Sequence, residues 1–233
     1  MKILAFETSA KAASVAITDD GKLIGEFYIN IGLTHSETML PMCEKLLGTA
    51  GYSLSDIDTI AVAAGPGSFT GIRIGIAAVK GLAFGRDIKC AAVSTLEAAA
   101  YNVSTFDGYI AAVMDARCNQ VYNAVFTCQN GRIERITPDR ALPIAELEKE
   151  IKLYKKQVIL VGDGAELCYN AYQKYEHVRL SAPAVRFQRA SSVAAAAEEG
   201  PFVTAEELEA FYLRLPQAER ELISRQKNKE VTP

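Results

Sequence analysis

Three short apolar runs, separated by polar turns, open the chain and predict a β-meander. Each run is too short for a helix and is bounded by charged or small polar residues. Asp19-Asp20-Gly21, which precedes the third run, is typical of a tight hairpin. The predicted strands lie at residues 2–6, 14–18 and 22–30.

A helix is predicted after the meander. Apolar residues recur at helical spacing from Thr34, and Glu37 three residues later matches a capping box. Gly48 or Gly51 is expected to end this helix, because glycine is favoured just past a helix C-terminus. A fully apolar strand then leads into a glycine-rich turn, a long helix, a strand and a helix capped by Ser94. The apolar strand is predicted at residues 59–64. After the turn, the long helix is predicted at 70–84, the next strand at 88–93 and the last helix from residue 94 onward.

The same order of elements starts again after Asn102. Two meanders, each followed by helices and strands, are typical of the actin/hexokinase/Hsp70-like (ASKHA) fold, an α/β fold whose two similar lobes flank a nucleotide cleft. The second-half strands are predicted at residues 109–114, 120–128, 132–137 and 157–161, the helices at 144–154, 165–175 and 191–199, and a last short element at 206–213.

We expect three segments along the chain. Residues 1–102 form an N-terminal lobe with partner-binding helices, and residues 103–215 form a reduced C-terminal lobe. Residues 216–233 are polar and charged, and this composition predicts a disordered tail.

Composition narrows the class of protein. The 233 residues carry a net charge of −3, whereas a protein that grips duplex nucleic acid alone usually has a basic surplus, so only a local basic patch is left open. No apolar run approaches the length of a membrane span. The five cysteines are scattered and form no CxxC pair, which indicates reduced thiols in a cytoplasmic protein.

The glycine-rich turn at residues 65–71 allows two interpretations. Glycines before a helix N-terminus let backbone N–H groups approach a phosphate, and the helix dipole favours an anion there. The alternative is a tight turn that needs positive φ at Gly65 or Gly67. The turn is not a Walker A loop, since no Lys-Ser/Thr pair follows it. The candidate nucleotide or phosphate contacts are Thr8, Ser9, Gly65, Gly67 and Ser68.

The helix at 70–84 is apolar almost all round, and Gly71 and Gly75 lie on one of its faces. Each glycine inside a helix costs roughly 1 kcal/mol relative to alanine, so close approach of another helix is expected there. We predict that a second subunit covers part of this helix, the alternative being a central helix sandwiched within one chain. The candidate interface residues are Met39, Cys43, Leu46, Ile72, Arg73, Gly75, Ile76 and Lys80.

Groups that carry chemistry are sparse. His35 and His177 are far apart in sequence and form no His-based metal motif. Asp115 and Arg117 follow a strand and are either catalytic or a turn cap or salt bridge. Glu7 is placed to position a metal-bound water, a role that usually needs a second carboxylate elsewhere in the chain. The only candidate for this second carboxylate is Asp163, and its Asp-Gly pair is also a common turn.

Read together, five strings resemble the TsaB (YeaZ) family of bacterial proteins, and the resemblance runs from residue 1 to about 214. The string at 63–75 is the most specific, and the others follow in order. They are ILAFETS (3–9), AAGPGSFTGIRIG (63–75), STLEA (94–98), DAR (115–117) with Tyr122, and YLR (212–214).

This resemblance implies a role in forming threonylcarbamoyladenosine at position 37 of tRNAs that read codons beginning with A. It implies an essential, non-catalytic partner of TsaD, the metal-holding paralogue that transfers the threonylcarbamoyl group. TsaE, an ATPase, joins the complex, and TsaC makes the threonylcarbamoyl-adenylate. The resemblance also implies a homodimer in isolation, formed by the first-lobe helices. We expect no tightly bound cofactor, with ATP or ADP at the interface with TsaD as the candidate ligand.

One departure from the paralogue bears on catalysis. TsaD-like proteins carry a His-x-x-x-His pair around a glutamate, and the matching positions here are Thr95 and Ala99 around Glu97. Neither replaces an imidazole as a metal ligand, which favours a scaffold that has lost the site. Two alternatives stay open: an independent kinase-like or metallopeptidase-like enzyme, which would bind stoichiometric metal or turn over ATP or peptide, and a nucleotide sensor of complex assembly.

Overall fold

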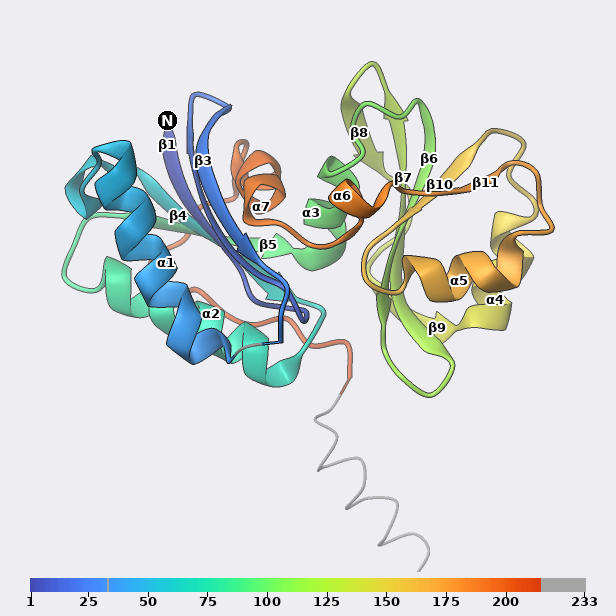
Figure 1. Cartoon of the computed structure of the whole chain (residues 1–233), viewed down its shortest axis with the longest axis horizontal. Helices are drawn as coiled ribbons and strands as arrows, with labels where there is room; N and C mark the ends of the chain where they lie inside the picture. Colours follow the sequence, from blue (N-terminus) through green and yellow to red (C-terminus); the bar gives the residue numbers. More distant parts are fainter. Residues whose placement is uncertain (33, 215–233) are drawn as a thin grey trace, which may run out of the picture.

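The protein consists of two mixed sheets with helices packed on both faces of each (Figure 1). The computed structural model describes residues 1–32 and 34–214. The first sheet has the order β3-β2-β1-β4-β5: the meander strands pair antiparallel, whereas β4 lies parallel to β1 and β5 parallel to β4. Its strands are β1 (Lys2–Glu7), β2 (Ala13–Asp19), β3 (Lys22–Ile29), β4 (Thr59–Gly65) and β5 (Lys89–Ser94).

The second sheet repeats this plan with the order β11-β10-β6-β7-β8, and β9 pairs with β7 beside β8. β6 and β7 pair antiparallel, and β10 lies parallel to both β6 and β11. The strands are β6 (Gly108–Asp115), β7 (Gln120–Gln129), β8 (Arg132–Arg135), β9 (Arg140–Pro143), β10 (Val158–Val161) and β11 (Val178–Leu180).

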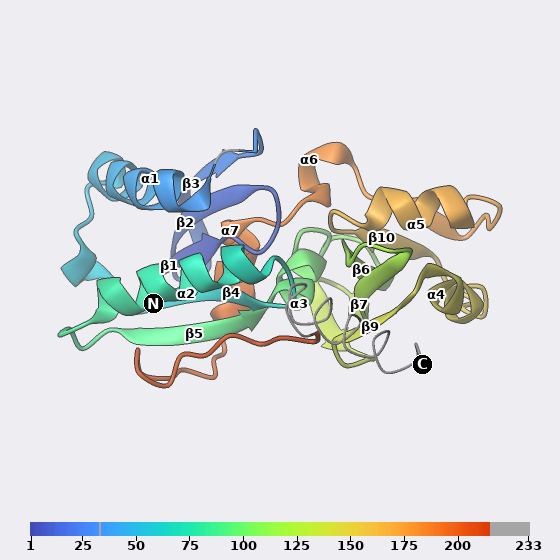
Figure 2. The same ribbon diagram turned by 90° about the horizontal axis from the view of Figure 1, so that it is seen from below.

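Alternation along the strands decides which helix covers which face of the first sheet. Leu4 and Phe6 of β1 face α1 (His35–Ala50) and α2 (Phe69–Ala83), whereas Ile3 and Ala5 face α7 (Ala190–Ala197). On the α7 side nearly all the buried side chains are alanine or valine, so the helix packs closely on the sheet. Figure 2 shows the strands of this sheet spread out in the order β3-β2-β1-β4-β5.

The short helix α3 (Thr95–Tyr101) is shared by the two lobes. Its Ala98 packs in the first-lobe core with α7, while Leu96, Ala99 and Ala100 pack in the second-lobe core. The outer face of the second sheet is covered by α4 (Ile144–Ile151) and α5 (Ala165–Tyr172). The remaining helices are η1 (Leu54–Asp56), a 3₁₀ turn, and α6 (Pro183–Arg186).

Most predicted elements are confirmed, including a β4 buried on both faces, the Gly51 C-cap with φ +74° and the Ser94 cap, whose hydroxyl accepts the Glu97 N–H at 3.2 Å. The predicted capping box at Thr34 is wrong: Thr34 flanks α1, but its side chain makes no cap hydrogen bond. The sequence prediction missed the short elements β9, β11 and α6. The element predicted at 206–213 is not a helix or strand but a turn and an extended segment.

The structure corrects the predicted boundary between lobes. α7 packs on the first sheet, and Leu208 is fully buried in the first-lobe core, so the chain returns to the first lobe after the second has formed. Cys90 of β5 and Val203 exchange two backbone hydrogen bonds of 2.8 Å, which fix this return. Residue 215 of the predicted lobe and the predicted tail at 216–233 lie outside the described residues.

Across the two described ranges, no helix combines the length and the apolar character needed to cross a membrane. The longest of them, α1, has 16 residues.

Two glycines of α2 mark where this helix crosses the loop after β1. A Cβ on Gly71 would overlap the carbonyl oxygen of Thr8, and one on Gly75 would lie 2.5 Å from the Thr8 hydroxyl. The close approach is present, but the prediction of another helix is wrong: the neighbour is the loop after β1. Gly81 on the same helix has nothing within 4 Å of its Cβ position.

Gly71→Ala should lower the free energy of unfolding by about 1–3 kcal/mol, the usual cost of overpacking. Gly81→Ala should instead raise it by about 1 kcal/mol, because alanine is the better helix former and space is free there. Urea unfolding followed by circular dichroism measures both. Equal effects of the two substitutions would contradict the close approach as the reason for Gly71.

Candidate functional site

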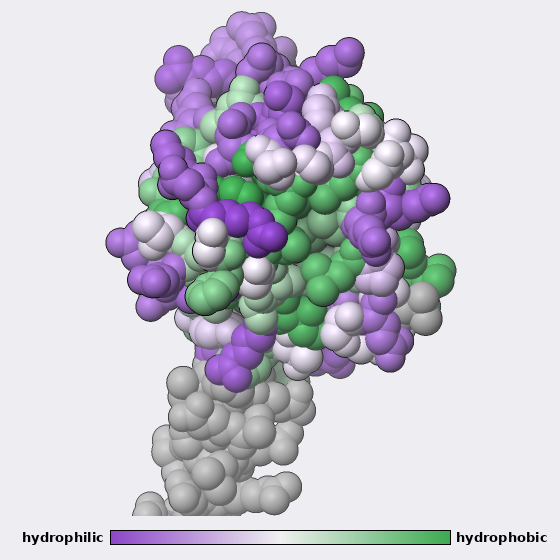
Figure 3. All heavy atoms as spheres, turned by 90° about the vertical axis from the view of Figure 1, so that its left-hand side faces the viewer, coloured by the Kyte–Doolittle hydropathy of each residue, from purple (hydrophilic) through white to green (hydrophobic). Residues whose placement is uncertain are grey.

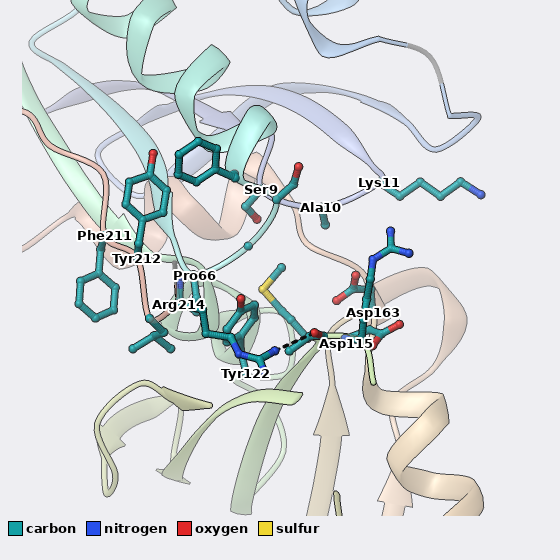
Figure 4. Close-up of a pocket in the computed structure, with 17 residues that line it drawn as sticks. Ser9, Ala10, Lys11, Pro66, Asp115, Tyr122, Asp163, Phe211, Tyr212 and Arg214 are labelled. Carbon is teal, nitrogen blue, oxygen red and sulfur yellow. Dashed lines mark hydrogen bonds between the residues drawn. The ribbon is translucent and has the colours of Figure 1, made fainter. Parts of the chain in front are cut away.

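A pocket of about 500 Å³ lies between the two lobes (Figure 4). Five segments distant in sequence form its walls: the loop after β1, the start of α2, the β6–β7 turn, the turn after β10 and the segment 211–214. Its charged lining residues are Lys11, Asp115, Arg117, Asp163 and Arg214.

The loop after β1 is closed on itself. Both the backbone N–H and the hydroxyl of Ser9 donate to one oxygen of Glu7, each at 2.6 Å. The Thr8 hydroxyl donates to the carbonyl oxygen of Gly71 at 2.8 Å. All three side chains are fully buried, so these hydrogen bonds form in a poorly solvated environment and hold the loop against the start of α2.

The glycine-rich turn is held by the same loop. Gly65 has φ +127° and faces the carbonyl oxygen of Phe211, where a Cβ would clash. The Ser68 N–H donates to the Ser9 carbonyl oxygen at 2.6 Å, and the Ser68 hydroxyl accepts the Gly71 N–H at 3.2 Å. The structure thus contains the tight turn of the second interpretation, and several donors that a phosphate would need are already used within the chain.

Residues 211–214 make hydrogen bonds to both lobes beside the pocket. The Phe211 N–H donates to the Ala64 carbonyl oxygen at 2.8 Å, so the segment is anchored to the first lobe. The Arg214 guanidinium reaches the β6–β7 turn, where it donates to the Ala116 carbonyl oxygen at 2.9 Å and to the Gln120 side chain (Figure 4).

An aromatic cluster extends this anchor. The Tyr212 ring lies 4.7 Å from the ring of Phe69, and its hydroxyl accepts a hydrogen bond of 3.2 Å from Arg73. The Arg73 guanidinium itself lies 3.9 Å from the centre of the Phe69 ring. The start of α2 and the terminal segment are thereby joined at the pocket rim.

Two carboxyl groups at the lobe junction have raised pKa values. Burial raises the pKa of Glu7 to about 7, although the Ser9 hydrogen bonds act in the opposite direction. The other oxygen of Glu7, Oε2, finds no hydrogen-bond donor in the described part of the chain. Burial also raises the pKa of Asp163, which accepts a 3.0 Å hydrogen bond from Gln188. The nearby Asp115 accepts the Arg117 N–H at 2.7 Å and is therefore a turn cap.

The predicted phosphate contacts divide into two groups. Ser9, Gly67 and Ser68 line the pocket, whereas Thr8 and Gly65 are not among its lining residues. The sequence prediction did not identify the opposite wall formed by residues 211–214. Its one available signal was the YLR string at 212–214, which gives no hint of where that segment packs.

His35 and the α3 positions that were compared with a metal-binding motif lie in contacts within the chain. His35 Nε2 lies 2.8 Å from the Ala10 carbonyl oxygen and ties α1 to the loop after β1. Thr95 and Ala99 are buried, Ala99 within the second-lobe core, and Glu97 forms a 2.8 Å ion pair with Arg135. Among residues 1–32 and 34–214, no cluster of three or more histidine, cysteine, aspartate or glutamate side chains is arranged to hold a metal ion.

The predicted partner interface needs correction, because most of its side chains face inward. Six of the eight residues are buried and pack against the protein's own first sheet, and burial raises the pKa of the Cys43 thiol to about 11. Arg73 is exposed and Lys80 is half-buried, and Lys80 donates to the Glu206 carbonyl oxygen at 3.1 Å. The inward-facing residues are Met39, Cys43, Leu46, Ile72, Gly75 and Ile76.

Part of the outward face of the same helices, mainly on α2, is nevertheless apolar. Figure 3 looks at the end of the molecule that carries α1 and α2 and shows a band of hydrophobic residues bordered by hydrophilic ones. Ile74, Ala77 and Gly81 follow one another along the outer side of α2, and Phe84 beyond its end is 81% exposed. Leu40 of α1 is 46% exposed. We call these five residues the outer helix face.

Comparisons with known proteins agree on one family. A family model described as "TsaD: tRNA N6-adenosine threonylcarbamoyltransferase" matches residues 31–229. The chain is 32% identical over 229 residues to the tRNA threonylcarbamoyladenosine biosynthesis protein TsaB of Bacillus subtilis (strain 168), which covers 97% of this chain and 100% of that protein. The structure of YeaZ from Pseudomonas aeruginosa aligns with a TM-score of 0.78 and 31% identity, covering 91% of this chain and 99% of that one.

A shorter similarity links the chain to the transferase itself. The tRNA N6-adenosine threonylcarbamoyltransferase of Jannaschia sp. (strain CCS1) is 51% identical over 51 residues, which are 22% of this chain and 14% of that protein. The fold is the actin/hexokinase/Hsp70-like fold predicted from the sequence.

Glu7 should make the stability of the protein depend on pH. Below about pH 4.5 the carboxyl is protonated in both the folded and the unfolded state. Between about pH 4.5 and 7 the carboxyl of the unfolded state ionises while that of the folded state stays protonated, so about 3 kcal/mol of stability is lost across this range. Glu7→Gln should therefore unfold at higher urea than the wild type at pH 8 and show a smaller pH slope.

The control is Glu44→Gln, an exposed glutamate of α1, which should keep the wild-type pH slope. Urea midpoints between pH 4.5 and 8 measure all three proteins. A wild-type slope in Glu7→Gln would show that another group titrates.

Proposed function

Because this chain belongs to the TsaB (YeaZ) family, we propose that it is a non-catalytic subunit in the formation of N6-threonylcarbamoyladenosine at position 37 of tRNAs reading codons that begin with A. It acts in the cytoplasm by binding and supporting the transferase TsaD. The observation that carries this proposal is the similarity to Bacillus subtilis TsaB, which extends over the whole of that protein.

The absence of catalysis is supported by α3. The positions that carry two metal-binding histidines in TsaD-like proteins hold Thr95 and Ala99, and both are buried within the protein. A hydroxyl and a methyl group do not supply the imidazole nitrogens that such a site uses. The chain therefore contributes to the reaction through its partner.

Binding to TsaD is assigned to the outer helix face. Its small residues Ala77 and Gly81 allow the backbone of another helix to come close, and Phe84 supplies a large apolar side chain. In isolation, a second copy of this chain covers the same face and forms a homodimer. TsaE joins through the complex with TsaD, and TsaC contributes by making the substrate.

Reconstituted tRNA modification tests the function. TsaD, TsaE and TsaC with threonine, bicarbonate, ATP and unmodified tRNA should form the modified base only when this chain is present. The nucleoside is measured by mass spectrometry. Equal product without this chain, or product from this chain in place of TsaD, would contradict the proposal.

Ala77→Arg should abolish pairing, because it places a charge in the middle of an apolar contact that excludes water. We expect binding to TsaD at least tenfold weaker, about 1.4 kcal/mol, together with loss of the homodimer. Leu167→Arg is the matched control: Leu167 is 41% exposed on α5 of the second lobe and lies outside the outer helix face. Calorimetry and sedimentation report the two interactions. Wild-type binding by Ala77→Arg would place the interface elsewhere.

Nucleotide binding should require the partner. The N–H groups of Ser9, Ser68 and Gly71 already donate within the chain, so few donors remain in this lobe for a phosphate. We expect ATP and ADP to bind weakly or not at all to the isolated chain and to bind at its interface with TsaD. Calorimetric titration of both nucleotides into the chain, with and without TsaD, measures this; tight binding by the chain alone would favour a nucleotide sensor.

A further inference from the structure

We propose that the chain contacts RNA directly, through a basic edge of the second sheet that binds the phosphate backbone of the tRNA. We call this surface the distal edge, and it consists of Lys152, Lys155, Lys156 and Arg179. The proposal rests on the proposed function, since that function brings the chain to a tRNA.

The sheet topology gathers these residues at one end of the lobe. β6, β10 and β11 are parallel neighbours, so the chain enters all three strands at the same edge. Lys155 and Lys156 lie before β10, separated from it by Gln157, and Arg179 lies in β11 opposite Ile159. Lys152 follows the last turn of α4. This edge is opposite the end that carries the β6–β7 turn and the pocket, toward the top right of Figure 1.

The distal edge has a surplus of positive charge in a chain whose net charge is −3. None of its four cations forms an ion pair with another described residue, and all four are exposed. The carboxylates around it are largely engaged: Glu134 pairs with Arg132, Glu148 with Lys174, and Glu150 with Arg140. Two neighbouring carboxylates, Asp107 and Glu176, lie outside these ion pairs.

Side chains beside the cations suit a nucleic acid. Tyr154, next to Lys155, stacks on Tyr109 with ring centres 4.2 Å apart, and the half-buried pair offers a fixed aromatic edge to a base or ribose. The Gln157 side chain accepts a 3.2 Å hydrogen bond from Nε of Arg179, which orients the guanidinium. An oriented guanidinium and adjacent lysines are the groups that hold phosphates.

The same surface is poorly suited to a membrane or to a protein interface. Leu153 is its one large exposed aliphatic side chain among the described residues, at 73%, and a single such side chain gives little anchoring in lipid. A stable protein interface needs an apolar core, which this edge lacks and the outer helix face provides. Because the two surfaces lie on different lobes, TsaD and tRNA can engage the chain at once.

The test measures binding of unmodified tRNA to the complex of this full-length chain with TsaD, by fluorescence anisotropy over a series of KCl concentrations. In Lys155→Glu/Lys156→Glu we expect about tenfold weaker binding and a salt dependence reduced by about two ions, as for the loss of two phosphate contacts. Lys22→Glu/Lys89→Glu makes the same charge change on exposed first-lobe lysines and should bind as the wild type does. Size exclusion confirms that each variant still assembles with TsaD.

The outcomes separate this proposal from the function on which it rests. Wild-type affinity and salt dependence in Lys155→Glu/Lys156→Glu would overturn the RNA contact, while modification that still requires the chain would leave the proposed function standing. Equal losses in both double variants would indicate a general charge effect and would also overturn it. Binding to vesicles of phosphatidylglycerol and phosphatidylcholine is measured as well. If Lys155→Glu/Lys156→Glu loses vesicle binding but keeps wild-type tRNA binding, the distal edge binds a membrane and the RNA contact is overturned.

Discussion

The crossing of α2 over the loop after β1 sets the geometry of the rest of the first lobe. Only glycine fits at Gly71, because the carbonyl oxygen of Thr8 lies where a side chain would begin. This contact brings Ser68 within reach of the Ser9 carbonyl and fixes the turn that forms one wall of the pocket. It also determines which side of α2 is buried, and hence which side remains for a partner.

The fold was predictable because most of its helices and strands are marked by patterns of residues that lie close together in sequence. Strand alternation, the hairpin at Asp20 and the Ser94 cap each depend on residues close together in sequence, and each is present in the structure. The short strands β9 and β11 were missed because they gain their pairing from β7 and β10 and lack the continuous apolar run that marks β10. The return of α7 to the first sheet depends on tertiary packing, which no local pattern encodes.

The candidate site was predictable only in part, for the same reason. Gly67 and Ser68 were identified because a glycine turn before a helix has a recognisable pattern, and they do line the pocket. The inward and outward faces of α2 were confused, since a helix that is apolar all round gives no sign of which side the sheet covers. Arg214 lies about 100 residues away in sequence from the β6–β7 turn that it contacts across the pocket, so no local sequence pattern predicts this contact.

The helix α3 has a mechanical consequence. One seven-residue helix supplies side chains to both hydrophobic cores, and three of its five buried residues are alanines. Moving one lobe against the other would take α3 out of one of its two cores, and residues 211–214 join the lobes at a second place. A change in the packing of α3 is therefore expected to alter the spacing of the two lobes, and with it the width of the pocket between them.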